Sequence, residues 1–167
     1  MMRHHKHIDW AQHLAPVDMR FLAQQIEPND WYPMETFERM GNAILSEVAD
    51  NDVELVRAWG WASVEPLRRA FPMLVADGDP IESLARFRVM RATFFDFEAI
   101  TLASLEGDEA RIGIAYQMGA RAEEAAAYQT MGFFEGVVQA AGVKSPRAAF
   151  SERSWTGDTR TLLVLAW

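Results

Sequence analysis

Histidines, which serve as metal ligands and as acid–base groups near neutral pH, are gathered at the start of the chain. All four lie in the first thirteen residues, at His4, His5, His7 and His13. Imidazoles this close together are the clearest set of metal ligands in the sequence, but a chain end is more often loosely ordered and solvated. We therefore predict a flexible N-terminus over residues 1–14 and no resident metal ion.

Carboxylate pairs are the second source of chemistry. Asp96 and Glu98 lie two residues apart at the entrance to an expected strand, where they would share one face, and Glu123 and Glu124 are neighbours on an alanine-rich helix. Two carboxyl groups can serve as general acid and base, although a solvated helix face is the commoner use of Glu123 and Glu124. An enzyme built on Asp96 and Glu98 requires the two groups to converge in a cleft with perturbed pKa values.

The familiar catalytic and metal-binding motifs are missing from the sequence. An acidic run at residues 50–54 is similar to the start of a calcium loop, but Leu55 and Trp61 occupy the sixth and twelfth positions, where glycine and glutamate are needed. The chain has neither cysteine nor a G-x-S-x-G, P-loop or G-x-G-x-x-G motif, which excludes thiolate chemistry and disfavours nucleophilic hydrolysis. We predict no catalytic residues, and we expect that the chain is not an enzyme.

Methionine and aromatic side chains are more suggestive, because such residues line adaptable pockets and partner grooves as well as cores. A row of arginines that includes Arg91 could meet an anionic ligand or partner, although pairing with an acidic residue of the same helix is the commoner use. Core packing is also the commoner use of each aromatic residue. The tentative ligand pocket consists of Trp31, Tyr32, Trp59, Phe87, Arg91 and Tyr116.

Length and composition set broad limits. A chain of 167 residues is the size of one domain, and a hydrophobic content of 50% predicts that it folds. Its formal charge of −8 and its scattered basic residues disfavour nucleic acid as a partner. The sequence has no apolar core of a signal peptide and no run long enough to span a bilayer. We therefore predict a cytoplasmic protein without membrane insertion.

Helical periodicity dominates the first half of the chain. The segment 9–28 has Pro16 at an early helical position, reaches its last apolar position at Ile26 and ends at Pro28. The segment after it contains Trp31 and Tyr32 and leads into a second helix.

That second helix is predicted from capping and spacing. Asn29 or Asp30 would cap it and Pro33 would lie in its first turn. Its apolar residues recur at intervals of three and four, which predicts a buried stripe. The stripe consists of Phe37, Met40, Ile44 and Val48.

Two further helical segments follow. The first begins after the caps Asp50 and Asp52 and is divided by Pro66. The second covers residues 80–93, with Asp79 as its N-cap and a proline at its first position. These helices complete the helical half of the chain.

The second half changes to the spacing of strands. Apolar, β-prone runs at 97–105 and 111–118 flank a Gly-Asp turn and form a first hairpin. A second hairpin turns at residues 156–158, and its last strand, residues 162–167, is apolar on both faces, as in a central strand. Between the two hairpins, residues 121–141 form an alanine-rich helix that ends at Gly142.

The predicted architecture is α+β. A helical part over residues 15–95 precedes a β-β-α-β-β part over residues 96–167, and both belong to a single domain over residues 15–167. Tight turns within each strand pair predict a largely antiparallel sheet with the long helix packed on one face.

This arrangement resembles a myxobacterial paralogous family of unknown function. The resemblance rests on the "WYP" turn, the helix "YQTMGFFEGVVQAAGV" and the closing "WTGDTRTLLVLAW". That family is similar in its C-terminal half to heme–nitric-oxide-binding domains and to the small-molecule-binding domain related to 4-vinyl reductase. The resemblance implies a sensor-like module with any pocket between the helical half and the sheet.

Heme is the ligand that this resemblance suggests first. Heme-binding relatives use a histidine on the helix before the sheet and a Tyr-x-Ser-x-Arg contact to the propionates. The chain has no histidine, cysteine or tyrosine between Pro80 and Ala99, and none of Tyr32, Tyr116 and Tyr128 begins the tyrosine motif. Without an axial ligand of the usual types, we expect neither heme nor another cofactor.

The leading hypothesis is a non-enzymatic sensor-like or regulatory domain that binds a small apolar ligand or a protein partner. The ligand version predicts an enclosed apolar pocket between the helices and the sheet, and a filled interface there counts against it. The alternative is a structural interaction protein that acts as a homodimer through exposed tryptophan and methionine side chains.

Overall fold

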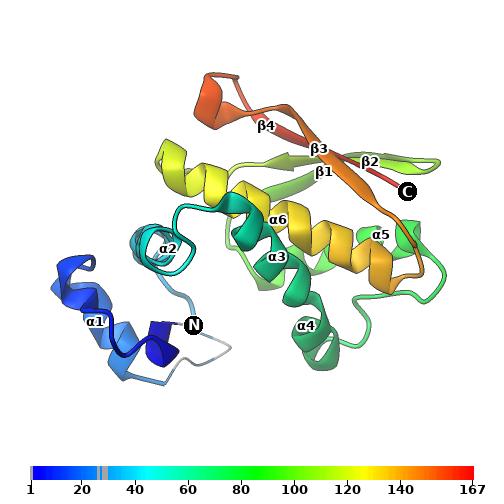
Figure 1. Ribbon diagram of the computed structural model, residues 1–167. Helices are drawn as coiled ribbons and strands as arrows, with labels where there is room; N and C mark the ends of the chain where they lie inside the picture. Colours follow the sequence, from blue (N-terminus) through cyan, green and yellow to red (C-terminus); the bar gives the residue numbers. More distant parts are fainter. Residues whose placement is uncertain (1, 26, 28–29) are drawn as a thin grey trace. The chain divides into compact units, whose positions relative to one another are not determined.

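The computed structural model describes the chain except for residues 1, 26, 28 and 29 (Figure 1). The chain divides into two compact units, Met1–Asp52 and Val53–Trp167, which we call the N-terminal and C-terminal units. The predicted positions Ile26, Pro28 and Asn29 lie outside the described residues.

The N-terminal unit is helical. Two short 3-10 helices, η1 (Met2–His4) and η2 (Trp10–Gln12), precede the α-helices α1 (Pro16–Ala23) and α2 (Met34–Glu47). The helix predicted over 9–28 is therefore broken into η2 and α1, because Pro16 begins a new helix at its first position instead of continuing the one before it.

The first residues of the chain take part in the packing of this unit. Met2, Trp10 and Leu14 are buried together with Ala43 of α2. The partly buried side chains that pack against them are Ile8, Met19, Leu22, Met40, Ile44 and Val48. The expectation of a solvated terminus does not hold for Met2, Trp10 and Leu14, because their apolar surface is removed from water.

A buried carboxylate connects α1 to α2. Asp18 is fully buried and accepts hydrogen bonds from the Ala15 amide at 3.1 Å, the Thr36 hydroxyl at 2.8 Å and the Arg39 guanidinium at 2.6 and 2.8 Å. The hydrogen bonds from Arg39 lower the pKa of Asp18 to about 2, although burial opposes this shift. The carboxylate therefore stays charged and joins the two helices.

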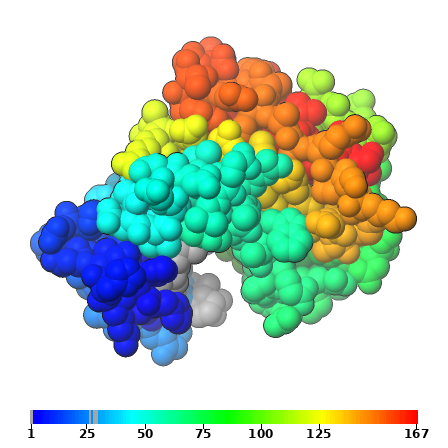
Figure 2. Space-filling view, viewed as in Figure 1, coloured from blue at the N-terminus to red at the C-terminus, as the bar shows by residue number. Residues whose placement is uncertain are grey.

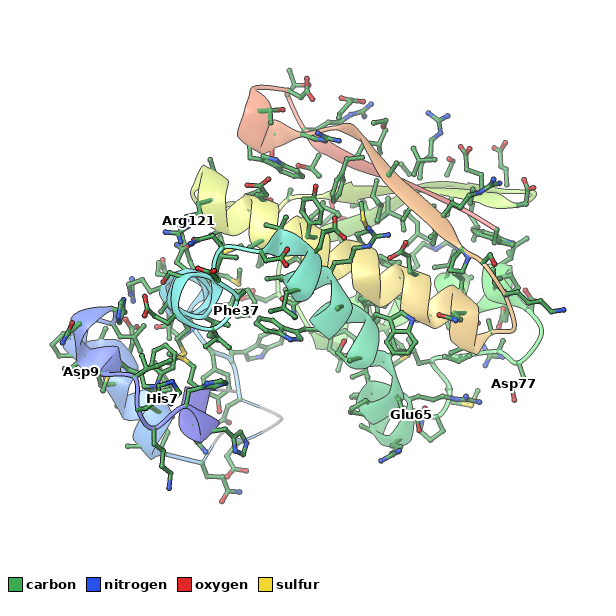
Figure 3. The ribbon with its side chains drawn as sticks, in the orientation of Figure 1. His7, Asp9, Phe37, Glu65, Asp77 and Arg121 are labelled. Atoms are coloured by element: carbon green, nitrogen blue, oxygen red, sulfur yellow. The ribbon has the colours of Figure 1, made fainter. Side chains whose placement is uncertain are left out.

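The start and the buried face of α2 differ from the prediction. Pro33, in extended backbone, is the N-cap residue, so the predicted cap at Asp30 is wrong. Phe37, labelled in Figure 3, is 47% exposed, so its place in the buried stripe is also wrong. The buried face passes instead through Thr36, because its hydroxyl reaches Asp18, and then through Ala43.

The C-terminal unit contains the sheet and most of the helices. Its helices are α3 (Val53–Ala62), α4 (Val64–Ala70), α5 (Pro80–Met90), the short η3 (Arg91–Thr93), α6 (Ala120–Ala140) and the short η4 (Ser154–Thr156). Its strands are β1 (Ile100–Glu106), β2 (Glu109–Ile114), β3 (Arg147–Glu152) and β4 (Thr161–Ala166). The α+β class and the β-β-α-β-β order are confirmed.

The sheet is antiparallel throughout, in the order β1-β2-β4-β3. On β4, Leu163 and Leu165 are fully buried, and Leu163 pairs with Phe150, whose ring contacts Tyr128 of α6. Leu162 and Val164 alternate with them and lie on the opposite face. The last strand is therefore central, as its apolar residues on both faces predicted.

Helix α6 lies along one face of the sheet, and α3 packs on the side of α6 away from the sheet (Figure 1). Several boundaries follow the predicted signals: Asp79 caps α5 by accepting a hydrogen bond from the Glu82 amide, and Gly142 follows α6 with a φ of 107°. The predicted division of the α3–α4 segment near Pro66 is confirmed. The break lies at Ser63, and Pro66 is the third residue of α4, where its missing N–H costs no intrahelical bond.

Candidate functional site

Three glycines bring α3 and α6 unusually close. A Cβ atom at Gly60 would lie 2.8 Å from the carbonyl carbon of Gln129, and one at Gly132 would lie 2.7 Å from the carbonyl carbon of Arg57. At Gly136, a Cβ would lie 3.1 Å from the carbonyl oxygen of Trp61 on α3 and 2.7 Å from a methyl group of Val64 on α4. Because these distances are far below ordinary contact, only glycine allows the two backbones to touch.

An ion pair ties the same two helices together at their surface. The Arg57 guanidinium donates to both carboxylate oxygens of Glu135, at 2.6 and 2.8 Å, and its third nitrogen donates to Glu54 at 3.0 Å. The hydrogen bonds from Arg57 to Glu135 raise the pKa of the guanidinium, so it remains charged. The Glu135 side chain is 11% exposed and that of Arg57 is 31% exposed, so the pair is largely screened from water.

A shallow groove lies over this pair, and we call it the α3/α6 groove. Its lining residues are Glu54, Arg57, Ala58, Trp61 and Glu135, and its volume is about 280 Å³. The space-filling view shows α3 (turquoise) on the surface of the C-terminal unit, covering part of α6 (yellow to orange) (Figure 2). Trp61 is 50% exposed, and its indole N–H donates to the Gln139 side chain at 2.7 Å, which fixes the ring orientation.

A layer of phenylalanine rings lies between α5 and α6. Phe87 of α5 is buried against Phe94, Phe133 and Phe134, with ring centroids 6.4, 5.4 and 4.9 Å apart. Phe71 extends the group by an edge contact to Phe94 at 5.6 Å. Closely packed aromatic rings of this kind stabilise a core. This filled layer counts against a ligand pocket here.

A second aromatic group surrounds Tyr116 after β2. The Tyr116 ring contacts Phe95 at 5.6 Å, and its hydroxyl lies 2.6 Å from that of Thr130. Burial raises the pKa of the Tyr116 phenol to about 12. The Glu123 carboxylate, which we expected on a solvated face, is buried and accepts hydrogen bonds from the Tyr116 and Met118 amides at 2.8 and 3.1 Å. It therefore fixes the chain that enters α6.

The residues of the tentative pocket belong to different surroundings. In the N-terminal unit, Trp31 is 60% exposed, and the Tyr32 hydroxyl bonds to the backbone of Glu27. In the C-terminal unit, Trp59 is half-buried on α3, Phe87 and Tyr116 lie in the two aromatic groups described above, and Arg91 pairs with Glu98 at 3.0 Å. A shared pocket for all six residues stays a prediction.

The candidate acid–base and metal-binding sets weighed from the sequence do not assemble among the described residues. Asp96 and Glu98 are both exposed, and Glu98 is held by Arg91, so they form no cleft of converging carboxylates. His13 lies 3.7 Å from Glu47, and the rings of His5 and His7 are 5.7 Å apart. Among the described residues, no group of three or more His, Cys, Asp or Glu side chains could hold a metal ion.

The side chains of the C-terminal unit do not fit the heme that the resemblance suggests. Residues 53–167 contain no histidine and no cysteine, and α5 directs Phe87 into the phenylalanine layer. Tyr116 is buried and its hydroxyl is bonded to Thr130, and its high pKa keeps it protonated. Histidine and cysteine axial ligands are therefore missing from this unit.

Sequence reasoning missed the α3/α6 groove. Arg57 and Glu135 are 78 positions apart, so no local pattern reveals their pairing. One signal was present: Gly132 and Gly136 recur four residues apart on α6, and small residues at this spacing allow two helices to approach closely. Such spacing indicates that a helix will cross there, although not which helix.

Comparison with known proteins gives a fold. The chain matches no protein-family model and no curated protein, so the resemblance to the myxobacterial paralogous family stays a prediction. None of the helices in the described part of the chain has both the length and the apolar character that a bilayer crossing requires. A solved structure described as "Probing the function of heme distortion in the H-NOX family" matches 90% of this chain and 84% of its own, with 12% identity and a TM-score of 0.61. The chain therefore has a fold similar to that of an H-NOX domain.

Proposed function

We propose that this chain is a non-enzymatic, sensor-like regulatory domain that works without heme and acts by binding a protein partner at the α3/α6 groove. The fold similarity to an H-NOX domain supports a sensor-like module. The observation that carries the rest is the α3/α6 groove with its exposed Trp61, whereas the contact between α5 and α6 is packed with the phenylalanine rings around Phe87.

The α3/α6 groove suits a partner chain better than an enclosed small molecule. It is open to solvent, and its volume of about 280 Å³ lies just below the usual range for small-molecule pockets. Its exposed tryptophan belongs to the residue types that contribute most to protein interfaces. The glycine contacts and the Arg57–Glu135 pair hold the surface in one shape before a partner arrives, which lowers the entropy cost of binding.

Site-specific photo-cross-linking in the native host tests this proposal. A photoreactive benzoylphenylalanine would replace Ala58, an exposed alanine in the groove, and in a control protein it would replace Ala149, an exposed alanine on β3. We expect one defined second chain to be joined at position 58 and not at position 149. Absence of an adduct at position 58, or the same adducts at both positions, would refute partner binding at the groove.

The purified partner then allows a quantitative test. Replacing Trp61 by alanine should weaken binding by roughly 30-fold, as expected for a central tryptophan that contributes about 2 kcal/mol. Circular dichroism must show the variant to be folded. A loss of less than twofold in a folded variant would mean that the partner binds elsewhere.

A small apolar ligand is the second form of this function, and it stays a proposal. The pocket named from the sequence draws Trp31 and Tyr32 from the N-terminal unit and its other residues from the C-terminal unit. Native mass spectrometry of the protein purified from its own host tests it: a retained small molecule of constant mass would favour the ligand form, and the bare chain mass would count against it.

A further inference from the structure

The Trp61 ring is held in one orientation and is partly exposed, so that it can bind a cation. The bond from its indole N–H to Gln139 fixes the ring, and half of the side chain remains open to solvent. Positive groups bind favourably over the face of an indole ring, which is the best of the aromatic rings for this purpose. Within the described residues, the basic side chain that lies over an aromatic ring is Arg20, above Phe21 in the N-terminal unit, so the Trp61 face holds no cation of its own.

The charges around the ring have the sign that attracts a cation. The groove contains the carboxylates of Glu54 and Glu135 and the guanidinium of Arg57, which leaves one formal negative charge. Glu135 neutralises Arg57 through two short hydrogen bonds at the base of the groove. The Glu54 side chain is 60% exposed and lies at the outer side of the same ion-pair network, so the negative charge faces an approaching partner.

From this anchored ring and the surrounding charges, we infer that the α3/α6 groove accepts a basic side chain of the partner, arginine in preference to lysine, stacked on Trp61 beside the Glu54 carboxylate. A guanidinium is planar, stacks on aromatic faces and is weakly hydrated, which favours it over the ammonium of lysine. A purely apolar side chain would remove water from the exposed Glu54 carboxylate without adding a positive charge beside it. An acidic side chain would be repelled by the groove and by a chain of net charge −8.

Binding of short blocked peptides, followed at the Trp61 indole N–H signal in a ¹⁵N NMR spectrum, tests this inference, which rests on the proposed function. The peptides are Gly-X-Gly, with arginine, lysine, leucine or glutamate in the centre. We expect a saturable shift of the Trp61 signal with the arginine peptide, with an affinity about fivefold higher than that of the leucine peptide. High salt should weaken the binding of the arginine peptide and leave the affinity of the leucine peptide nearly unchanged.

Two matched variants locate the charge effect. Glu54→Gln should lower the affinity for the arginine peptide about threefold without altering that for the leucine peptide. Glu65→Gln should change neither affinity, because Glu65 is an exposed carboxylate on α4, labelled in Figure 3, that pairs with Arg69 outside the groove. Both variants alter exposed carboxylates, so they test binding without a change in the core.

Three results would overturn the inference: no shift of Trp61 with the arginine peptide, equal affinity for the arginine and leucine peptides, or equal effects of Glu54→Gln and Glu65→Gln. These results are independent of the cross-linking experiment. A partner joined at position 58 without any preference for arginine would retain the proposed function and refute the inference. Arginine binding without a cross-linked partner would refute partner binding at the groove and retain the preference of the groove for arginine.

Discussion

The contact between α3 and α6 allows a quantitative prediction for Gly132→Ala. The added Cβ would lie 2.7 Å from the carbonyl carbon of Arg57 and 3.0 Å from the amide nitrogen of Trp61, and closer still to the Arg57 carbonyl oxygen. Ordinary contacts between carbon atoms are about 3.5–4.0 Å. The helices must therefore separate by roughly 1 Å at their crossing, because backbone atoms cannot turn aside as a side chain can.

The cost follows from two opposing effects. Overpacking a closely packed site costs about 1–3 kcal/mol and sometimes more, and a clash with backbone lies at or above the upper end. Alanine recovers about 1 kcal/mol through its higher helix propensity. We expect a net loss of about 2–3 kcal/mol in the free energy of unfolding of the C-terminal unit, or roughly 10 °C in its melting temperature.

Urea denaturation followed by circular dichroism measures this loss, with Gly41→Ala as the matched control. Gly41 also lies within a helix, but a Cβ there would meet nothing within 4 Å. In the control, the free energy of unfolding should rise by about 0.5–1 kcal/mol, because alanine has a higher helix propensity than glycine. If Gly132→Ala were as stable as the parent, or gained stability like the control, the close backbone contact of α3 and α6 would be wrong.

Three further predictions concern ionisation and cofactor binding. The pKa of Asp18 is lowered to about 2 from its ordinary 3.8. The stability that this carboxylate provides is therefore fully present above about pH 4 and is lost as the pH falls from about 4 to 2. Asp18→Asn should lower the free energy of unfolding by about 2 kcal/mol at pH 7 and flatten the acid side of the stability profile. A profile unchanged by this substitution would contradict the buried pair with Arg39. The pKa of Tyr116 is raised from 10 to about 12, so stability should fall as the pH rises from about 10 to 12, and the absorbance at 295 nm should show one tyrosine that ionises late; this late step should be absent in Tyr116→Phe. Hemin added to the purified chain should give the spectrum of free hemin, and a shifted, saturable Soret band would show that we have misjudged the heme site.

The elements with strong local signals could be predicted from the sequence. Asp79 and a proline mark the start of α5, Gly142 marks the end of α6, and the apolar residues on both faces of the last strand indicate its central place. In each case one short stretch contains the full physical cause. These signals were enough to predict the α+β class and the order of the elements.

The features that depend on distant residues could not be predicted in this way. Glu123 resembles any solvated glutamate until the chain before α6 turns its amides toward the carboxylate. Phe37 follows the apolar spacing of α2, but the buried face is set by Thr36 and its bond to Asp18. The groove itself depends on Arg57 meeting Glu135 across two helices.

The most direct test of the account compares the loss of two exposed apolar side chains in binding to the cross-linked partner. Trp61→Ala removes the exposed ring of the groove, and Met73→Ala removes an apolar side chain that is 68% exposed outside it. We predict that Trp61→Ala weakens the affinity roughly 30-fold and that Met73→Ala changes it less than about twofold. Equal effects of the two substitutions, or a larger effect of Met73→Ala, would contradict the claim that the α3/α6 groove is the functional surface.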